Sequence, residues 1–355
     1  MGAMLRQIGL VLGLILTFSL LVSGQNGVGD AKTGLPKSIA APLLTSPILI
    51  DGKLDDPAWK KAPWSETFDD IEGNKNPKPP LATKIKMLHD SKGLYIGVEM
   101  EEPHLQGTFS EHDSYIFHLD NDFEVFIDSD GDCQNYVELE MNAKNTTWDL
   151  LMTKPYRDGG RALDSFELKG VQTAVFLDGT LNDPSDTDRG WTVEIFLPWK
   201  SLAEVGSGVP PKIGDRWRIN FSRVEWEWDI KDNKYVKKPG RPERNWVWSP
   251  QGEINMHLPE RWGSVVFVGP EDGLKPLPLD EEAKARLTLG RIHQAQQAYR
   301  GKKGSFAQTL AELKLDPTPF APEDITLWAN ADRYQAQVPS KRPLKLSIRE
   351  DGGLR

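Results

Sequence analysis

The sequence predicts an all-β fold, an antiparallel and jelly-roll-like β-sandwich, followed by a small α+β appendage. Two observations carry this prediction. Short segments in which apolar and polar residues alternate follow one another from Ile48 to Gly269, with turn residues between them and no βαβ pattern. A Pro- and Gly-rich stretch then leads into a helical pattern within residues 280–355, a region to which no role is assigned.

The first residues have the layout of a secretory signal peptide. Arg6 precedes an apolar run from Ile8 to Val22, and small residues follow as far as Gly24. The run of about 15 residues is short for a membrane span of roughly 20. We therefore expect residues 1–24 to be cleaved and the protein to be secreted or periplasmic, with an uncleaved membrane anchor as the alternative. Residues 25–44, which are rich in Gly and Lys, are predicted to be a linker.

The sandwich is predicted over residues 45–269. Its expected strands, in chain order, are TKIKMLHD, GLYIGVEM, DFEVFID, YVELEMN, VQTAVFL, WTVEIFLP, WRINFSRVEWEW and WGSVVFV. One short helix is expected at residues 198–205. In the appendage, a longer helix is expected in EEAKARLTLGRIHQAQQAYRG and a second in FAQTLAELKL, with strand-like runs after them.

Composition and motifs argue against nucleic-acid binding, an internal disulfide and several common enzyme classes. The net charge of −9 argues against nucleic-acid binding, which needs a clustered basic face. The only cysteine, Cys133, cannot form an internal disulfide. The chain has no G-x-S-x-G, H-E-x-x-H, P-loop or dinucleotide fingerprint.

Alternation assigns many polar side chains to one face of the sheet. Asp122 and Glu124 point away from Phe123, Val125 and Ile127, since successive strand residues face opposite sides. Glu138, Glu140 and Asn142 share a face in the next strand, and Asn220 lies on the polar side of a later one. A hairpin would bring Glu124 near Glu138 or Glu140. A solvated sheet face explains this pattern without any ligand. Short acids and amides beside aromatic residues instead suit a sugar.

The turn DSDGD suggests a calcium site. Asp128, Asp130 and Asp132 are oxygen ligands spaced by two, although the EF-hand pattern fails because Cys133 stands where Gly would be required. An acidic β-turn without metal explains the same residues.

Three other functions stay open. Two of the glutamates could act as the carboxylate pair of a glycoside hydrolase. A haem-binding sandwich would need axial ligands, for which Met256 with His257 or His118 are the candidates. A purely structural cell-surface sandwich needs no site at all.

Six segments in this order resemble carbohydrate-binding module family 9 and its wider family 9-like group. They are ILIDGKLDDPAWKKAPW, KMLHDSKGLYIGVEMEEP, DNDFEVFIDSDGDCQNYVELEMNAKNTTWDL, GWTVEIFLPWKSL, GDRWRINFSRVEW and PERWGSVVF. The resemblance implies a non-catalytic β-sandwich that binds saccharides, with structural calcium in some members. Such modules often accompany secreted enzymes that degrade polysaccharides, so a link to carbohydrate catabolism is implied too.

The resemblance also implies a site. Family members that bind sugars clamp the ring between two aromatics, whose places here fall near Phe117 and His118 and near Met256 and His257, with no Trp at either. The main hypothesis is therefore a secreted, non-catalytic saccharide-binding protein with a polar sheet face and nearby aromatics. The predicted ligand contacts are Phe117, His118, Glu124, Glu138, Glu140, Asn142, Trp148, Asn220, Trp248 and His257, and the predicted calcium ligands are Asp128, Asp130 and Asp132.

Overall fold

The structure, a computed structural model, describes residues 34–315, 319–340 and 345–355. The expected signal peptide and the first part of the expected linker lie outside the described residues. Within the described residues, no helix has the length and apolar character needed to cross a membrane.

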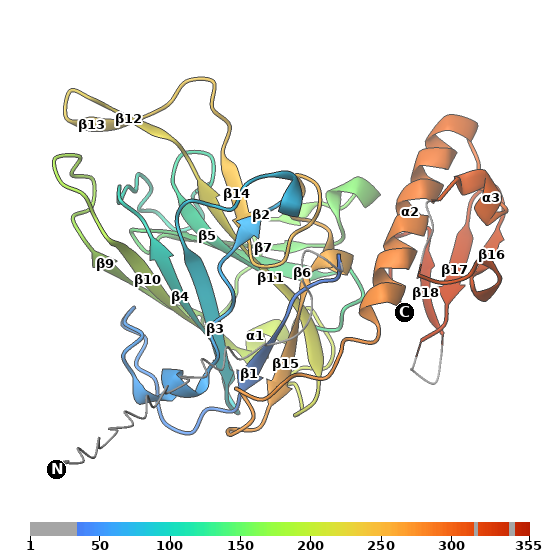
Figure 1. Ribbon diagram of the computed structural model, residues 1–355, viewed down its shortest axis with the longest axis horizontal. Coiled ribbons are helices and arrows are strands. Elements are labelled where there is room, and N and C mark those ends of the chain that lie inside the picture. Colours follow the sequence, from blue (N-terminus) through green and yellow to red (C-terminus); the bar gives the residue numbers. More distant parts are fainter. Residues whose placement is uncertain (1–33, 316–318, 341–344) are drawn as a thin grey trace, which may run out of the picture.

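Two sheets face each other and form the predicted sandwich (Figure 1). The smaller sheet has the order β3-β4-β10-β9. The larger has the order β1-β15-β11-β5-β6-β7-β8, with β14 beside β11 and β2 beside β14. The strands of the smaller sheet are β3 (Thr83–His89), β4 (Gly93–Glu101), β9 (Gln172–Asp178) and β10 (Gly190–Pro198). Those of the larger are β1 (Ser38–Pro42), β2 (Asp69–Asp70), β5 (Asp122–Asp128), β6 (Tyr136–Asn142), β7 (Thr147–Met152), β8 (Ala162–Leu163), β11 (Arg216–Glu225), β14 (Arg244–Val247) and β15 (Gly263–Val268).

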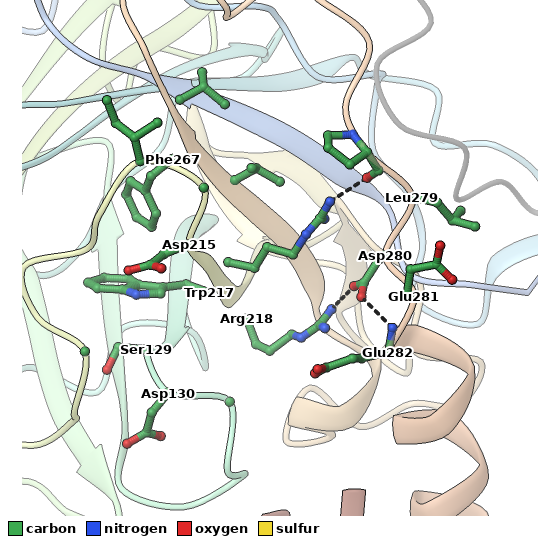
Figure 2. Close-up of a pocket in the computed structure, with 18 of the residues that line it drawn as sticks. Ser129, Asp130, Asp215, Trp217, Arg218, Phe267, Leu279, Asp280, Glu281 and Glu282 are labelled. Atoms are coloured by element: carbon green, nitrogen blue, oxygen red, sulfur yellow. Dashed lines mark hydrogen bonds and ion pairs between the residues drawn. The ribbon is translucent and has the colours of Figure 1, made fainter. Parts of the chain in front are cut away.

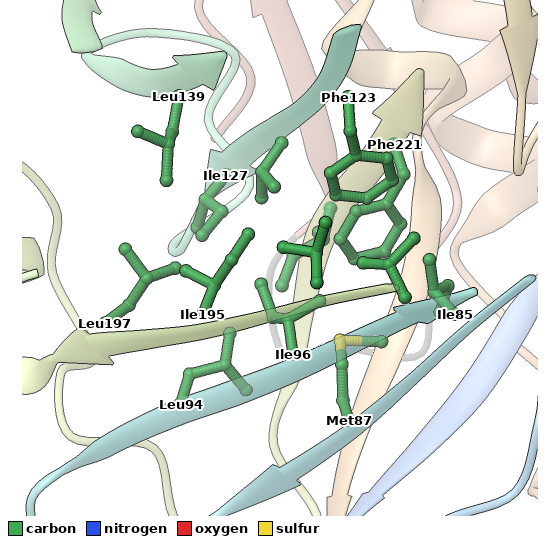
Figure 3. Packing of buried hydrophobic residues seen from close by; sticks show 14 of the residues in the cluster. Ile85, Met87, Leu94, Ile96, Phe123, Ile127, Leu139, Ile195, Leu197 and Phe221 are labelled. Atoms are coloured by element: carbon green, nitrogen blue, oxygen red, sulfur yellow. The ribbon is translucent and has the colours of Figure 1, made fainter. Parts of the chain in front are cut away.

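The main core fills the space between these sheets. Figure 3 shows Leu94, Ile96 and Ile195 of the smaller sheet pointing toward Phe123 and Ile127 of β5. All of these side chains are at most 2% exposed. The predicted inward face of β5 is therefore confirmed, and its even-numbered residues point to the other side of the larger sheet.

Strand β1 corrects the predicted linker. Ser38–Pro42 pairs in parallel with β15, and Ile39, Ala40 and Ala41 are all buried. Because both faces of this strand are covered, its residues do not alternate between apolar and polar, and the strand has no periodic signature.

The Asp-Gly turn near the start of the sandwich is held by a buried carboxylate. Glu194 of β10 accepts hydrogen bonds from the amides of Asp51 and Gly52 and from the indole of Trp59, at 2.8–3.0 Å. The segment ILIDGKLDDPAW therefore has a structural role, because these bonds attach its turn and its tryptophan to β10. Short 3-10 helices interrupt the loops: η1 (Pro57–Lys61), η2 (Gly73–Lys75), η3 (Tyr156–Asp158), η4 (Pro259–Arg261) and η5 (Pro322–Asp324).

The C-terminal region forms the predicted α+β appendage beside the sandwich (Figure 1). Helix α2 lies between η4 of the sandwich and a small antiparallel sheet. The two further predicted helices exist but are short. The elements are α1 (Trp199–Leu202), α2 (Ala283–Lys303), α3 (Leu310–Leu313), β16 (Thr326–Ala329), β17 (Tyr334–Val338) and β18 (Leu346–Arg349). A separate hairpin of β12 (Trp228–Lys231) and β13 (Lys234–Lys237) extends from the sandwich.

Candidate functional site

The register of the larger sheet places the predicted acids in one group. Glu124 of β5 is paired with Glu140 of β6 on one side and with Ser222 of β11 on the other. Glu140 is in turn paired with Trp148 of β7. Directly paired antiparallel residues share a face, so these four side chains form a row across the outer face of the sheet. Asp122 lies on the same face as this row, two residues before Glu124 in β5. Glu138 also lies on this face, two residues before Glu140 in β6, and it flanks the row on the side opposite to Asp122.

This face of the larger sheet is enclosed, which excludes a solvated sheet face. Asp122, Glu124, Glu138 and Glu140 are each at most 5% exposed. Apolar side chains bury it: Phe126, Trp148, Leu150 and Val247 come from strands of the sheet, and Ile71, Ile116, Phe117, Met256 and Trp262 come from loops that cross the face. Burial therefore encloses four carboxyl groups in one small region.

Burial also changes the acidity of these groups. It raises the pKa of Glu124 to about 7. It raises the pKa of Asp122 well above its ordinary value, and the charge of Glu124 adds to this effect. The pKa values of Glu138 and Glu140 rise for the same reasons, burial first and the neighbouring carboxylates second. An enclosed carboxylate loses its hydration, and a neighbouring negative charge disfavours ionisation further.

Two exposed tyrosines flank the carboxyl groups. Tyr115 is 49% exposed, and its ring lies 4.9 Å from that of Trp148 between centroids. Tyr156 is 52% exposed. Burial is the main cause of the raised pKa of each tyrosine, and the charges of Glu138 and Glu140 contribute to both shifts. Both hydroxyls are therefore close enough to the same two glutamates to feel their charge.

His257 connects this group to Tyr156. Its ring is 4.6 Å from the ring of Tyr156, and a hydrogen bond of 2.9 Å joins its Nδ1 to the hydroxyl of Tyr136. Its Nε2 lies 4.0 Å from a carboxylate oxygen of Glu138. Burial lowers the pKa of His257 to about 4, so the ring is neutral at pH 7.

Three predicted ligand contacts have structural roles instead. Trp248 is 1% exposed and lies in the core between the sheets, so it does not reach the polar face. Asn220 exchanges hydrogen bonds with the backbone of Ser249. Asn142 uses its amide to hold Phe109 and Asp120, and its oxygen accepts from two amides of the following turn. Trp248 is corrected: it was predicted as an aromatic near the polar residues, but its ring packs in the core on the other side of the sheet.

The predicted corner at Phe117 and His118 lies beside the site. Both side chains are half-buried and surround Tyr115, with ring centroids 4.7 and 4.9 Å away from its own. They support the tyrosine, which is the exposed ring of this loop. Sequence reasoning missed both Tyr115 and Tyr156. They lie in non-periodic loops. Tyr115 is close in sequence to the corner at Phe117 and His118, whereas Tyr156 meets His257 only in the folded chain and has no sequence signal.

The acidic turn lies at a different place, where the appendage meets the sandwich. Carboxylate oxygens of Asp128, Asp130 and Asp132 lie within 4.8 Å of one another. Asp128 accepts from the amides of Gly131 and Cys133, and Asp130 accepts from Ser207. Arg286 of α2 donates to the carbonyl of Gly131, and its charge acts on Asp128 and Asp132. A calcium ion would have to compete with these partners. Calcium at this turn stays a prediction.

A cleft with a volume of about 760 Å³ runs beside the acidic turn. Figure 2 shows Arg218 and Asp280 pointing toward each other in this cleft, where their ion pair measures 2.6 Å. Trp217, Phe267 and Leu279 form part of its wall. None of the four buried carboxyl groups of the sheet face lines it, so the cleft is separate from the candidate site.

Comparison with known proteins identifies the family of the sandwich. The profile of the "Carbohydrate family 9 binding domain-like" family matches residues 50–269. No curated protein matches the chain. Similar solved structures include a candidate carbohydrate-binding protein from Bacteroides uniformis, with 16% identity, a TM-score of 0.48, and coverage of 65% of this chain and 99% of that one.

A family 9 carbohydrate-binding module from Caldicellulosiruptor kristjanssonii is similar in two structures. The cellotriose complex has 18% identity, a TM-score of 0.41, and coverage of 69% of this chain and 100% of that one. The glucose complex has 18% identity, a TM-score of 0.41, and coverage of 68% and 100%. Since the profile covers more than half of the sequence and spans the sandwich from β2 to β15, the chain belongs to the carbohydrate family 9 binding domain-like family.

Proposed function

We propose that the sandwich binds a saccharide, without catalysis, between Tyr115 and Tyr156 and over Glu138 and Glu140. The observation that carries this proposal is that two half-exposed tyrosine rings lie near the same two carboxyl groups, whose charges raise the pKa of both tyrosines. A pyranose has an apolar face that lies against an aromatic ring and hydroxyls that need hydrogen-bond partners.

The neighbouring polar groups offer both kinds of partner. The hydroxyls of Tyr115 and Tyr156 donate and accept, as a sugar hydroxyl does. In His257, Nδ1 is hydrogen-bonded to the hydroxyl of Tyr136, which leaves Nε2, 4.0 Å from Glu138, as the ring nitrogen that can contact a ligand. A site bordered by carboxyl groups suits a neutral sugar better than a sulfated or phosphorylated one, because ionised carboxylates would repel an anion.

Isothermal titration calorimetry with a saccharide panel tests the proposal. The panel includes glucose and cellotriose, which are bound in the similar module from Caldicellulosiruptor kristjanssonii. We expect Tyr115→Ala and Tyr156→Ala each to weaken binding about tenfold or more, since truncating one aromatic contact typically costs over 1 kcal/mol. Trp328 of β16 is 56% exposed and lies in the appendage, so Trp328→Ala is the matched control and should bind normally.

Two results would contradict the proposal: background binding to every saccharide of the panel, or unchanged affinity in both tyrosine variants. Incubation with the same oligosaccharides separates binding from hydrolysis. We expect intact oligosaccharides, whereas cleavage that is lost in Glu138→Gln would support a glycoside hydrolase.

We also propose export from the cytoplasm, on the strength of the apolar run that follows Arg6. Sequencing the N-terminus of the protein from its own host tests this proposal. A mature chain that begins close after Gly24 is the expected result, and a chain that retains residues 1–24 would favour a membrane anchor.

A further inference from the structure

The buried acids of the larger sheet lack a counter-charge. Asp122, Glu124 and Glu140 are 0%, 5% and 2% exposed, and one oxygen from each lies within 4.8 Å of the others. Within the described part of the chain, no Lys or Arg makes a salt bridge with any of the three. Three other buried acids differ, since Glu102, Glu260 and Asp280 each form an ion pair with an arginine. Enclosed negative charge without such a partner is costly.

Unpaired oxygens point to a missing ligand. Among the described residues, both carboxylate oxygens of Asp122 and one of Glu140 are buried and make no hydrogen bond of normal geometry. The hydroxyl of Ser222, on a different strand, is also fully buried, and it faces the carboxylate of Glu124, whose pKa it lowers. Ser222 is paired with Glu124, so its hydroxyl belongs to the same row. Native proteins pair nearly all buried polar atoms, and a group of orphans at one place calls for an explanation.

We propose that Asp122, Glu124 and Glu140, with Ser222, bind a divalent cation, and that this cation is calcium. Calcium takes six to eight oxygen ligands at roughly 2.3–2.6 Å, so its ligands lie within about 5 Å of one another. Three carboxylates and one hydroxyl offer seven oxygens. Zinc is disfavoured because it prefers Cys and His ligands, and Mg²⁺ because it keeps several waters.

This site differs from the acidic turn of Asp128, Asp130 and Asp132. At the turn, protein amides and hydroxyls already occupy carboxylate oxygens, and Arg286 supplies positive charge. At the sheet face, the described residues supply these oxygens with no cation and no hydrogen bond of normal geometry. Asp122 and Glu124 lie at the start of β5, whereas Asp128 ends this strand and Asp130 and Asp132 follow it, so substitutions separate the two sites.

A cation here would lie under the proposed saccharide site. Glu140 is paired with Trp148, and Trp148 contacts Tyr115. By coordinating Glu140, the cation would hold in place the residues on which Tyr115 packs. The metal proposal does not rest on saccharide binding, since the ion is measured with no sugar present.

The test uses the full chain, stripped with a chelator and titrated with CaCl₂ by calorimetry. We expect one calcium site in the wild type, and a rise in unfolding temperature on adding the ion, because a ligand that binds only the folded state stabilises it. Asp122→Asn and Glu140→Gln should weaken binding at least tenfold. Asp130→Asn, at the acidic turn, is the matched control and should bind as the wild type does. Ser222→Ala removes one neutral ligand with little change in volume, and should weaken binding by a smaller factor.

Each other outcome overturns the proposal. Binding that is lost in Asp130→Asn but kept in Asp122→Asn places the ion at the acidic turn. No binding at millimolar calcium, together with higher stability in Asp122→Asn, shows that the buried group carries protons instead. Circular dichroism identifies any variant that fails to fold. If the carboxylate variants do not fold, calcium binding by Ser222→Ala tests the proposal, and unchanged affinity in this variant contradicts it. Saccharide binding is measured separately on Tyr115→Ala, so the two proposals can fail independently.

Discussion

At the scale of single residues, His257 shows how a buried ring controls stability. Burial lowers its pKa to about 4, while an unfolded chain has a histidine near 6.5. Between these values the unfolded chain binds the proton more tightly than the folded one. Stability from this residue is therefore complete above about pH 6.5 and falls as the pH drops toward 4. The loss reaches about 3 kcal/mol when the ring is fully charged.

Urea unfolding of the wild type and of His257→Gln at several pH values measures this effect. We expect the difference in free energy of unfolding between the two proteins to shrink or reverse as the pH falls from 7 to 4.5. The comparison is needed because other groups titrate in the opposite sense: burial raises the pKa of Glu225 to about 8. A difference that stays constant with pH would contradict the low pKa of His257.

The residues of the candidate site also show what alternation reveals. The period of two put Glu124, Glu138 and Glu140 on one face, and their pairing in the structure follows from it. It could not show that loops cover this face, since burial depends on segments distant in sequence. Nor could it find Tyr115 and Tyr156, because loop residues have no period and only the folded chain brings both near Glu138.

At the scale of elements, the strands that bury one face were predictable and β1 was not. Strands β3, β4, β5 and β6 each alternate in sequence, because one side of each faces the main core. Strand β1 is short and buried on both sides, and its pairing with β15 joins residues more than 220 positions apart. Such a strand gains its stability from tertiary contacts and leaves little local signal.

Helix α2 docks on the sandwich at a glycine. A Cβ atom at Gly290 would lie 2.7 Å from Cγ of Glu260, which is closer than real contacts allow. Glu260 cannot move aside easily, because Arg157 holds both of its carboxylate oxygens at 2.7 and 2.9 Å. We therefore expect Gly290→Ala to destabilise the chain by about 1–3 kcal/mol through overpacking, even though Ala favours a helix by about 1 kcal/mol.

The test is whether each substitution raises or lowers the free energy of unfolding. A methyl group at Gly301, in the same helix, would meet no atom within 4 Å beyond the helix's own backbone, so Gly301→Ala should stabilise the helix by up to about 1 kcal/mol. Chemical unfolding of both variants gives the two signs. If Gly290→Ala also stabilises the chain, then α2 is not held against η4 as described.

At the scale of the whole molecule, the appendage is joined to the sandwich by polar contacts as well as by packing. The amide of Leu354 donates to the carbonyl of Asp132, and Arg286 donates to that of Gly131. His293 of α2 donates from Nε2 to Asp158 at 2.6 Å, and its Nδ1 is hydrogen-bonded to the hydroxyl of Tyr334. Burial raises the pKa of Asp158, but His293 and Arg157 outweigh it, and the net pKa is lowered. The carboxylate is thus ionised and paired.

This link predicts that the two parts lose stability together when it is cut. Asp158 and His293 are 1% and 0% exposed in their side chains, so removing one partner leaves a buried polar group unpaired. We expect Asp158→Asn and His293→Gln each to lower the free energy of unfolding by about 3 kcal/mol, and the double variant to lose less than their sum. Asp178 and Arg189 form an exposed pair, 44% and 81% exposed, so Asp178→Asn should leave the free energy of unfolding almost unchanged. Urea unfolding of the four variants gives these values, and strictly additive losses at Asp158 and His293 would show that the pair does not couple the appendage to the sandwich.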